Sequence, residues 1–395
     1  MRGIWPAIAF VLLTHVAEAT PASFALAVTD GKLAGPGAEI LRAELSRAQF
    51  ILYGEDHGFA DSPIILRAIA REAKPLGFHY LVEEVGPLST RMIRETLKKD
   101  GIVDDVPLGI PFLGLKDDAL LASDFLGQDA KGTPYLWGID QEFIGSPGFH
   151  LKRLVDIAPN DAARAAATKL LADEQDAASK GAQQNFLLVK FHDTDFEVLA
   201  AQFKGSVEAQ AIIGELKESA AIYQLWMNGH NYENNARRAR FLAKHFLAVY
   251  KSAATPEPKI VFKMGVEHLG LGTTPNNTVD IGTLVSKIAQ VNGKTALRIA
   301  FLPTGGHNTA FQPKPGNPAT IEVYKPDETA PFFSAIGFDA AVLPANGWTL
   351  IPLEPIRQSL DTKGIEKLDP MSRFILLGFD YIITTPDAKA GVSLY

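Results

Sequence analysis

Short apolar runs that end at glycine or at charged residues recur along this chain, and they constrain its fold more than any other feature. The first covers residues 49–53 and ends in Gly54-Glu55-Asp56-His57. Further runs cover residues 79–85, 134–139, 259–264, 296–302, 340–343 and 379–384. Segments whose apolar residues have helical spacing lie between several of these runs. Strands that alternate with helices predict an α/β fold with a mostly parallel central sheet flanked by helices.

The middle of the chain has a different texture. Residues 147–250 are rich in Ala, Gln, Glu and Lys and show helical spacing throughout, which predicts a helical insertion that forms a cap. Residues 304–332 are rich in Gly, Pro, Asn and Thr, which predicts a long surface loop. We expect a single α/β domain over residues 20–395 that contains this insertion.

The first residues are typical of a signal peptide. Arg2 precedes an apolar run over residues 4–13, and Ala17-Glu18-Ala19 offers a small-residue cleavage site. A second candidate site lies at residues 25–27. About ten apolar residues are too few to span a bilayer, and no later segment is apolar enough to do so. The sequence therefore predicts a signal peptide over residues 1–19 and a periplasmic or secreted protein.

Composition narrows the function. The formal net charge of −7 does not favour a nucleic-acid-binding protein, which usually carries a basic surface. The chain has no Cys, so it has neither disulfides nor a thiolate nucleophile. No Gly-x-Ser-x-Gly elbow and no Gly-x-Gly-x-x-Gly fingerprint occurs after the first strand, which argues against an ordinary serine hydrolase and a dinucleotide-binding protein. A small-molecule substrate is the expected partner.

Polar side chains gather where the predicted strands end. The first strand ends in Glu55 and His57, and the next ends in Glu83 and Glu84. Asp140 follows the third strand, and Glu267 and His268 follow the strand over residues 259–264. Because parallel strands present their carboxyl ends at one edge of the sheet, where ligands bind, we expect these side chains to line one crevice.

His57 lies in a tight turn, where it is either a solvated surface side chain or a general base that activates water. In the second case Glu55 orients its ring, although Glu55 is also suited to holding an Arg. Strand alternation places Glu83 and Glu84 on opposite faces of the sheet. A carboxylate at the end of a buried strand is costly unless it is paired, so each is a candidate for an ion pair or a catalytic role.

Three further residues are candidates with plain structural alternatives. His268 follows the strand that ends near Gly265. Arg238 shares a helix face with Leu242 and His245 and either binds a carboxylate or substrate oxyanion or is simply solvated. His307, in a Gly-rich segment, lies either in a binding lip or in a mobile loop.

Several short motifs, in order, resemble the erythromycin esterase-like superfamily, which includes haem-binding lipoproteins and Tiki/TraB metalloprotease relatives. Residues 52–58 are similar to its Gly-Glu-x-His motif, and residues 80–87 to its strand that ends in a Glu, here Glu84. Residues 137–140, 238–245, 263–268 and 378–381 resemble its later motifs.

The resemblance implies an α/β fold with a helical cap over a deep cleft, and hydrolysis without a bound metal in the esterase branch. His57 would be the general base on water, Glu55 and Glu84 would orient groups around it, and His268 would assist. Arg238 would bind a carboxylate or oxyanion. Asp140, Glu267 and His307 are the expected substrate-binding residues. Only one residue separates Glu55 from His57, whereas macrolide esterases usually have two, so the motif does not favour a macrolide substrate.

Two other functions fit the same motifs. One is a non-catalytic protein that binds haem or a similar cofactor. The other is a metal-dependent hydrolase or protease, because carboxylates and imidazoles are ligands of Zn²⁺ and Mn²⁺. Its candidate ligands would be Glu55, His57, Glu84, Glu267 and His268.

Overall fold

The computed structural model of the protein describes residues 21–98, 101, 114–311, 319–327, 329–344, 346–360 and 362–394. The predicted signal peptide of residues 1–19 lies outside these residues. The second candidate cleavage site lies inside strand β1 (Phe24–Thr29), where Leu26 is buried. Cleavage after Ala27 would remove four of the six residues of this paired strand.

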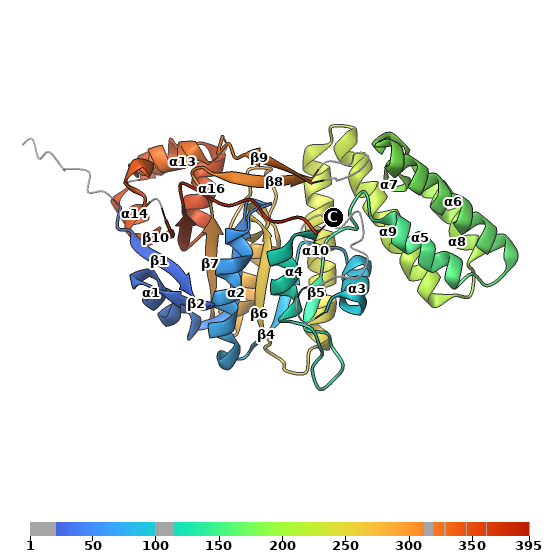
Figure 1. Ribbon diagram of the computed structural model, residues 1–395, viewed down its shortest axis with the longest axis horizontal. Helices are drawn as coiled ribbons and strands as arrows, with labels where there is room; N and C mark the ends of the chain where they lie inside the picture. Colours follow the sequence, from blue (N-terminus) through green and yellow to red (C-terminus); the bar gives the residue numbers. More distant parts are fainter. Residues whose placement is uncertain are drawn as a thin grey trace, which may run out of the picture.

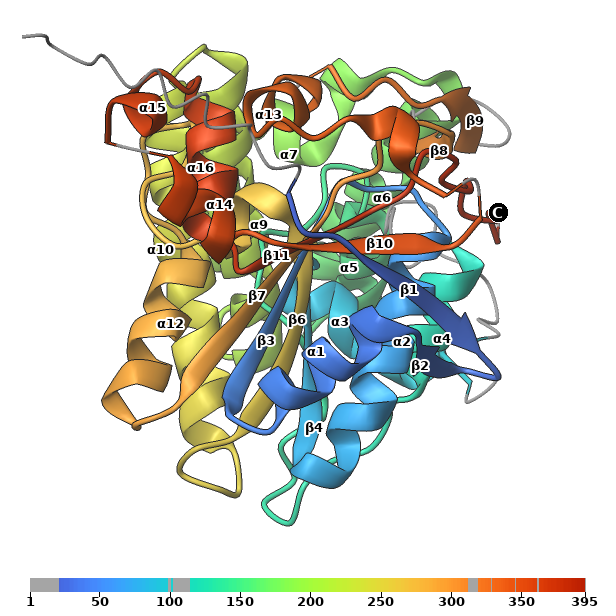
Figure 2. The same cartoon turned by 90° about the vertical axis from the view of Figure 1, so that its left-hand side faces the viewer.

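The predicted parallel sheet is confirmed (Figures 1 and 2). Its parallel part consists of β3 (Ala48–Glu55), β4 (Phe78–Glu83), β5 (Leu136–Gly138), β6 (Lys259–Gly265), β7 (Thr295–Phe301) and β11 (Tyr381–Thr384). An antiparallel edge consists of β1, β2 (Lys32–Ala34) and β10 (Trp348–Pro352). The strand order is β2-β1-β10-β11-β7-β3-β6-β4-β5. After β5 the chain returns to the centre to form β6 and then β7, so the connections change direction around β3, where ligands bind in open α/β sheets.

Helices cover both faces of the sheet, as Figure 2 shows. One face carries α1 (Pro36–Leu45), α2 (Asp61–Ala73) and α4 (Lys116–Ser123), packed on Ile51, Tyr53 and Leu81. The other carries α10 (Asn231–Ser252), α12 (Ile281–Val291), α13 (Ala330–Ala335) and α16 (Pro370–Gly378). Because side chains alternate along each strand, neighbouring residues such as Leu52 and Tyr53 belong to different cores.

The insertion is helical, as predicted. It contains α5 (Pro147–Asp156), α6 (Asp161–Lys180), α7 (Leu187–Lys190), α8 (Asp193–Gln202) and α9 (Val207–Met227). These helices form a bundle with its own apolar core, which includes Leu151, Phe196 and Leu216. The bundle stands beside the sheet in Figure 1. By contrast, α10 packs on the sheet itself through Leu242 and Phe246.

The remaining elements are short. They are η1 (Lys74–Leu76), α3 (Pro87–Thr96), η3 (Gln183–Asn185), α11 (Val266–Leu269), β8 (His307–Phe311), β9 (Ala319–Val323), η4 (Ala340–Val342), α14 (Glu354–Ser359) and α15 (Thr362–Glu366). Among the described helices, none is both long enough and apolar enough to cross a membrane.

Two sequence predictions are wrong. Residues 340–343 contain the single turn η4 (Ala340–Val342) rather than a strand, and the strand in this region is β10. Residues 304–332 are not only a loop: β8 and β9 pair in an antiparallel hairpin, and α13 follows. The hairpin escaped prediction because β8 carries no apolar alternation and β9, although it alternates, is only five residues long within a segment rich in Gly and Pro.

Candidate active site

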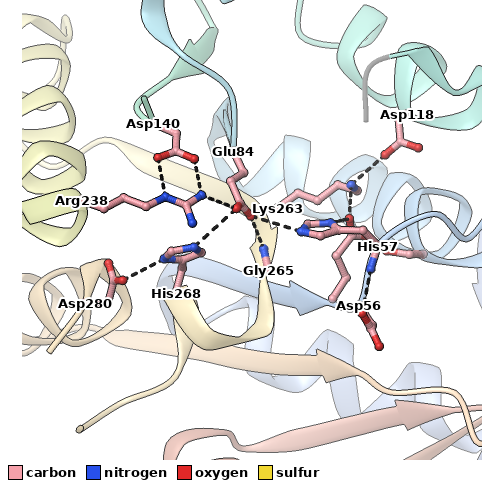
Figure 3. A network of polar contacts seen from close by, with 12 residues as sticks. Asp56, His57, Glu84, Asp118, Asp140, Arg238, Lys263, Gly265, His268 and Asp280 are labelled. Carbon is pink, nitrogen blue, oxygen red and sulfur yellow. Dashed lines mark hydrogen bonds and ion pairs between the residues drawn. The ribbon is translucent and has the colours of Figure 1, made fainter. Parts of the chain in front are cut away.

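Three neighbouring strands bring the predicted residues together at their carboxyl ends. Glu55 is the last residue of β3, Glu84 directly follows β4, and β6 runs into α11, which carries Glu267 and His268. Because β6 pairs with both β3 and β4, these side chains meet over the centre of the sheet. Figure 3 shows the resulting cluster.

Glu84 is the centre of this cluster. Its Oε1 accepts a hydrogen bond of 2.6 Å from Arg238 Nη2 and lies 3.4 Å from His268 Nε2. Its Oε2 accepts a hydrogen bond of 2.5 Å from the backbone N–H of Gly265 and lies 3.5 Å from His57 Nε2. Burial alone would raise the pKa of Glu84, but the cationic neighbours hold it well below its usual value.

Glycine at position 265 favours this close approach. A Cβ atom there would lie 3.2 Å from both Glu84 Oε2 and His57 Nε2. Those distances are tight, and a side chain would also displace the carboxylate from the backbone N–H. The glycine at the end of β6 therefore allows the sheet to supply a hydrogen-bond donor to the site.

His57 lies between two carboxylates. Its Nδ1 is 2.9 Å from Glu55 Oε1, and its Nε2 faces Glu84. Burial would lower the pKa of His57, but the hydrogen bonds to Glu55 and Glu84 raise it to about 10. The side chain is 28% exposed, so it is open to a substrate. At neutral pH the ring is therefore an imidazolium that faces the cavity.

His268 repeats this arrangement on the other side of Glu84. Its Nδ1 is 2.8 Å from Asp280 Oδ2, and Asp280 is also the N-cap of α12. Burial and the nearby Arg238 lower the pKa of His268, whereas Asp280 and Glu84 raise it, to about 10 overall. The site thus contains one carboxylate between two imidazolium rings, each supported by a second carboxylate.

Arg238 comes from α10 and reaches the cluster from the opposite side. Its Nε donates a hydrogen bond of 2.9 Å to Asp140 Oδ1, and its Nη2 binds both Asp140 and Glu84. Asp140 is almost fully buried. This two-point contact fixes the guanidinium plane, so Asp140 acts as the residue that orients Arg238.

A buried ion cluster lies beneath His57. Lys263 Nζ donates a hydrogen bond of 2.6 Å to Glu55 Oε1 and lies 2.7 Å from Asp118 Oδ1. Ser62, in the first turn of α2, donates to Glu55 Oε2. Burial would raise the pKa of Glu55, but Lys263 and His57 lower it to about 2. Glu55 is therefore a permanent anion that holds His57 in place and in its protonated form.

Glu83 belongs to the same cluster but has no hydrogen bond to its buried Oε1. Burial raises its pKa to about 8, and the neighbouring Asp118 and Glu55 add to this effect while Lys263 opposes it. Glu83 is thus protonated in the folded protein at neutral pH, whereas in the unfolded chain it would be ionised at the same pH.

This state predicts how stability depends on pH. Between the ordinary carboxyl pKa and about 8, the folded chain binds one proton more than the unfolded chain, so stability falls as pH rises through this window. Glu83→Gln should remove this pH-dependent loss of stability. At pH about 9 its free energy of unfolding should exceed that of wild type by a few kcal/mol. Denaturant unfolding at two pH values measures this. Glu95→Gln, an exposed change, is the matched control, and equal pH slopes in all three proteins would contradict the assignment.

A cavity of about 480 Å³ opens above the cluster. Its lining includes His57, Glu84, Glu267 and His268. The opposite wall comes from Tyr324, Lys325, Asp327, Thr329 and Met371, which belong to the segment after β9 and to α16. The Tyr324 hydroxyl donates a hydrogen bond of 2.6 Å to Asp56 Oδ2, which ties this wall to the His57 turn.

The structure brings together the five residues predicted to be catalytic: Glu55, His57, Glu84, Arg238 and His268. Glu267 lines the cavity and accepts a hydrogen bond of 2.5 Å from Asn276. His307 is exposed at the start of β8 and is not part of the cavity lining. Asp140 lies behind Arg238 rather than in that lining.

Several residues of the site were not predicted from the sequence. Lys263 could have been predicted from the sequence to form a buried ion pair, since a charged residue inside an apolar strand must be paired. Asp280 was recognisable as a helix cap but not as a partner of His268. Asp118 and Tyr324 gave no signal, because their roles depend on contacts between distant segments.

The donor set does not fit a bound metal ion. Among the described residues, no group of three or more His, Asp and Glu side chains is arranged to hold one. The chemistry explains this, because the oxygens of Glu84 already accept from Arg238 and Gly265, and Glu55 pairs with Lys263. Cations of the protein itself occupy the carboxylates.

Comparison with solved structures identifies the fold. A mutant of erythromycin esterase EreC in its open conformation superimposes with a TM-score of 0.59 and 15% identity, covering 95% of this chain and 100% of that one. The chain has the erythromycin esterase fold. A succinoglycan biosynthesis protein shares it, with a TM-score of 0.52, 11% identity and coverage of 91% and 93%.

The resemblance expected from the motifs is therefore confirmed at the level of the fold. No protein-family model matches the chain, and no curated protein is significantly similar in sequence. At identities this low, the erythromycin esterase fold is what the chain shares with these structures, and its function rests on its own residues.

Proposed function

We propose that this protein is an exported hydrolase of the erythromycin esterase-like type, which cleaves an ester or related bond of a small molecule by direct attack of water. The observation that carries the proposal is the position of His57, which faces an open cavity and is held from behind by an anionic Glu55. A ring fixed in this way is oriented to exchange a proton with a water in the cavity.

The other charged groups have defined tasks in this proposal. Glu84 holds the two imidazole rings and the guanidinium of Arg238 around one point. Hydrolysis of an ester passes through an oxyanion, and cations fixed in place before the reaction stabilise such a charge most effectively. Arg238 and protonated His268 supply that positive charge, while His57 acts as the general base.

This assignment has a specific pH dependence. His57 must be neutral to accept a proton, and its pKa is raised to about 10. The neutral fraction therefore grows about tenfold per pH unit below that value. We expect kcat/KM for a generic ester to rise between pH about 7 and 9, to peak near 10 and to fall above it, because His268, whose pKa is also raised to about 10, must stay protonated.

Turnover of 4-nitrophenyl acetate and related esters across this pH range tests the proposal. A rate that is flat at neutral pH and falls near pH 10 would make His57 a proton donor instead. The same assay after dialysis against a chelator separates this proposal from a metal-dependent hydrolase, because activity should be retained. A visible absorption band in the purified protein would indicate the haem-binding alternative.

A further inference from the structure

A second cavity, of about 440 Å³, lies on the far side of Arg238. Its lining includes Arg238 itself, which reaches through to Glu84 in the first cavity. A second contact joins the two cavities, because Asn276 lines the second and donates a hydrogen bond to Glu267, which lines the first. The two cavities are therefore adjacent, and the contacts Arg238–Glu84 and Asn276–Glu267 join their linings.

The second cavity is lined mainly by carboxamides. Gln141, Asn231, Asn234, Asn235 and Asn276 are part of it. A carboxamide both donates and accepts hydrogen bonds, and it has capacity for more than one of each. Its natural partners are groups that also do both, above all hydroxyls.

Several of these carboxamides are held in place. Asn235 Nδ2 donates a hydrogen bond of 2.8 Å to the Asn231 carbonyl, and Asn234 Nδ2 donates one of 2.7 Å to the Ile222 carbonyl. Each bond uses only part of the capacity of the group. The cavity thus offers oriented polar groups on a rigid helix, as specific binding sites do.

Two aromatic side chains complete the lining. Tyr223 lies beside the Asp140–Arg238 pair, and burial with the nearby Asp140 carboxylate raises its pKa well above the usual value. Trp226, at the end of α9, has 58% of its surface exposed. An aromatic face left open beside a polar cavity can stack on the apolar face of a ligand ring.

The charge of the cavity excludes one class of ligand. Among the described lining residues, Arg238 is the only charged side chain, and its charge is balanced by Asp140 and Glu84. An anion such as a phosphate or sulfate would find no uncompensated cation there. A neutral ligand with many hydroxyls and an apolar ring face fits the lining.

We propose that this second cavity is a subsite for a neutral sugar ring of the substrate, with Trp226 stacking on the ring and the carboxamides binding its hydroxyls. The inference rests on the proposed function, since it makes the substrate a glycoside. Its sugar ring would lie in the second cavity, and its scissile ester or related bond would lie in the first. Sugar binding itself is measurable without turnover, so the two proposals can fail separately.

The test uses the full-length protein carrying His57→Asn, in which hydrolysis is slowed by a factor on the order of 10²–10⁴. Saturation-transfer NMR measures binding of methyl glucoside, galactoside, mannoside and rhamnoside, with sorbitol and methyl phosphate as comparison compounds. We expect at least one glycoside to bind more tightly than sorbitol or methyl phosphate. Failure of all four glycosides to bind, or tighter binding of methyl phosphate, would overturn the proposal.

Two matched pairs of substitutions locate the binding. Trp226→Ala should weaken glycoside binding about tenfold, whereas Met227→Ala, at the neighbouring exposed position outside the lining, should not. Asn235→Ala should also weaken it, unlike Asn228→Ala, whose side chain makes the same type of bond to the Gln224 carbonyl. Equal losses within either pair would show an effect on the helices rather than on a subsite, and would refute the inference.

If the glycoside binds as expected but wild type hydrolyses no ester of any kind, the subsite stands and the proposed hydrolase function fails. If esters are hydrolysed in a manner that depends on His57 but no glycoside binds, the hydrolase stands and the subsite fails.

Discussion

Replacing His57 by asparagine should lower kcat/KM for ester hydrolysis by a factor on the order of 10²–10⁴, the range that general base catalysis contributes. The reason is geometric. Among the described residues, His57 is the ring that contacts both Glu55 and Glu84, and asparagine has no group that accepts a proton from water at this pH. The effect should fall on kcat more than on KM, because proton transfer belongs to the transition state.

His79→Asn is the matched control for that variant. His79 is exposed near the start of β4, at the end of the strand opposite to Glu84. It should retain the activity of wild type. Thermal unfolding of both variants checks that the fold is intact. If His57→Asn keeps more than about a tenth of the activity, another group is the base, and Glu84 becomes the first candidate.

Replacing Lys263 by methionine should destabilise the fold by about 3–5 kcal/mol, the usual effect of removing one partner from a buried ion pair. Lys263, Glu55 and Asp118 are all at most 4% exposed in their side chains. Without the ammonium group, two carboxylates remain buried with no cation between them. One must then take up a proton, or the strands β3 and β6 must separate locally.

Lys259→Met is the control for this stability measurement. Lys259 lies on the same strand, is partly exposed, and places its Nζ 5.0 Å from the ring centre of Phe78. Its loss should alter the free energy of unfolding by less than about 1 kcal/mol. Denaturant titration measures both variants. Adding Glu55→Gln and Asp118→Asn to Lys263→Met should restore part of the loss, and no restoration would show that the three groups do not form one cluster.

Sequence patterns gave a good account of the site because the relevant residues follow apolar strands. Glu55, His57, Glu84 and His268 each lie just beyond such a strand, and parallel packing brings those ends together. Patterns did less well where strands are short or lack a clear apolar alternation. The hairpin β8–β9 and the antiparallel strand β10 were missed, and with the hairpin the wall of the cavity that contains Tyr324.

The role of individual residues was harder to predict than their presence. Asp140 follows β5 as expected, but it orients Arg238 instead of lining the cavity. His307 had a plausible Gly-rich context, yet it lies on an exposed strand outside the cavity lining. Only the folded chain shows which of two nearby polar groups faces the ligand and which holds its neighbour.

The sequence by itself determined the fold class and most of the catalytic cluster, because strand and helix periodicity and the position of polar residues at strand ends are local properties. The tertiary structure decided the ionisation states and the second cavity. Those depend on Lys263, Asp118 and Asp280, and on the meeting of α9 with α10, all of which come from segments far apart in the chain. Electrostatic energies and cavity shape arise from such distances, and no local pattern encodes them.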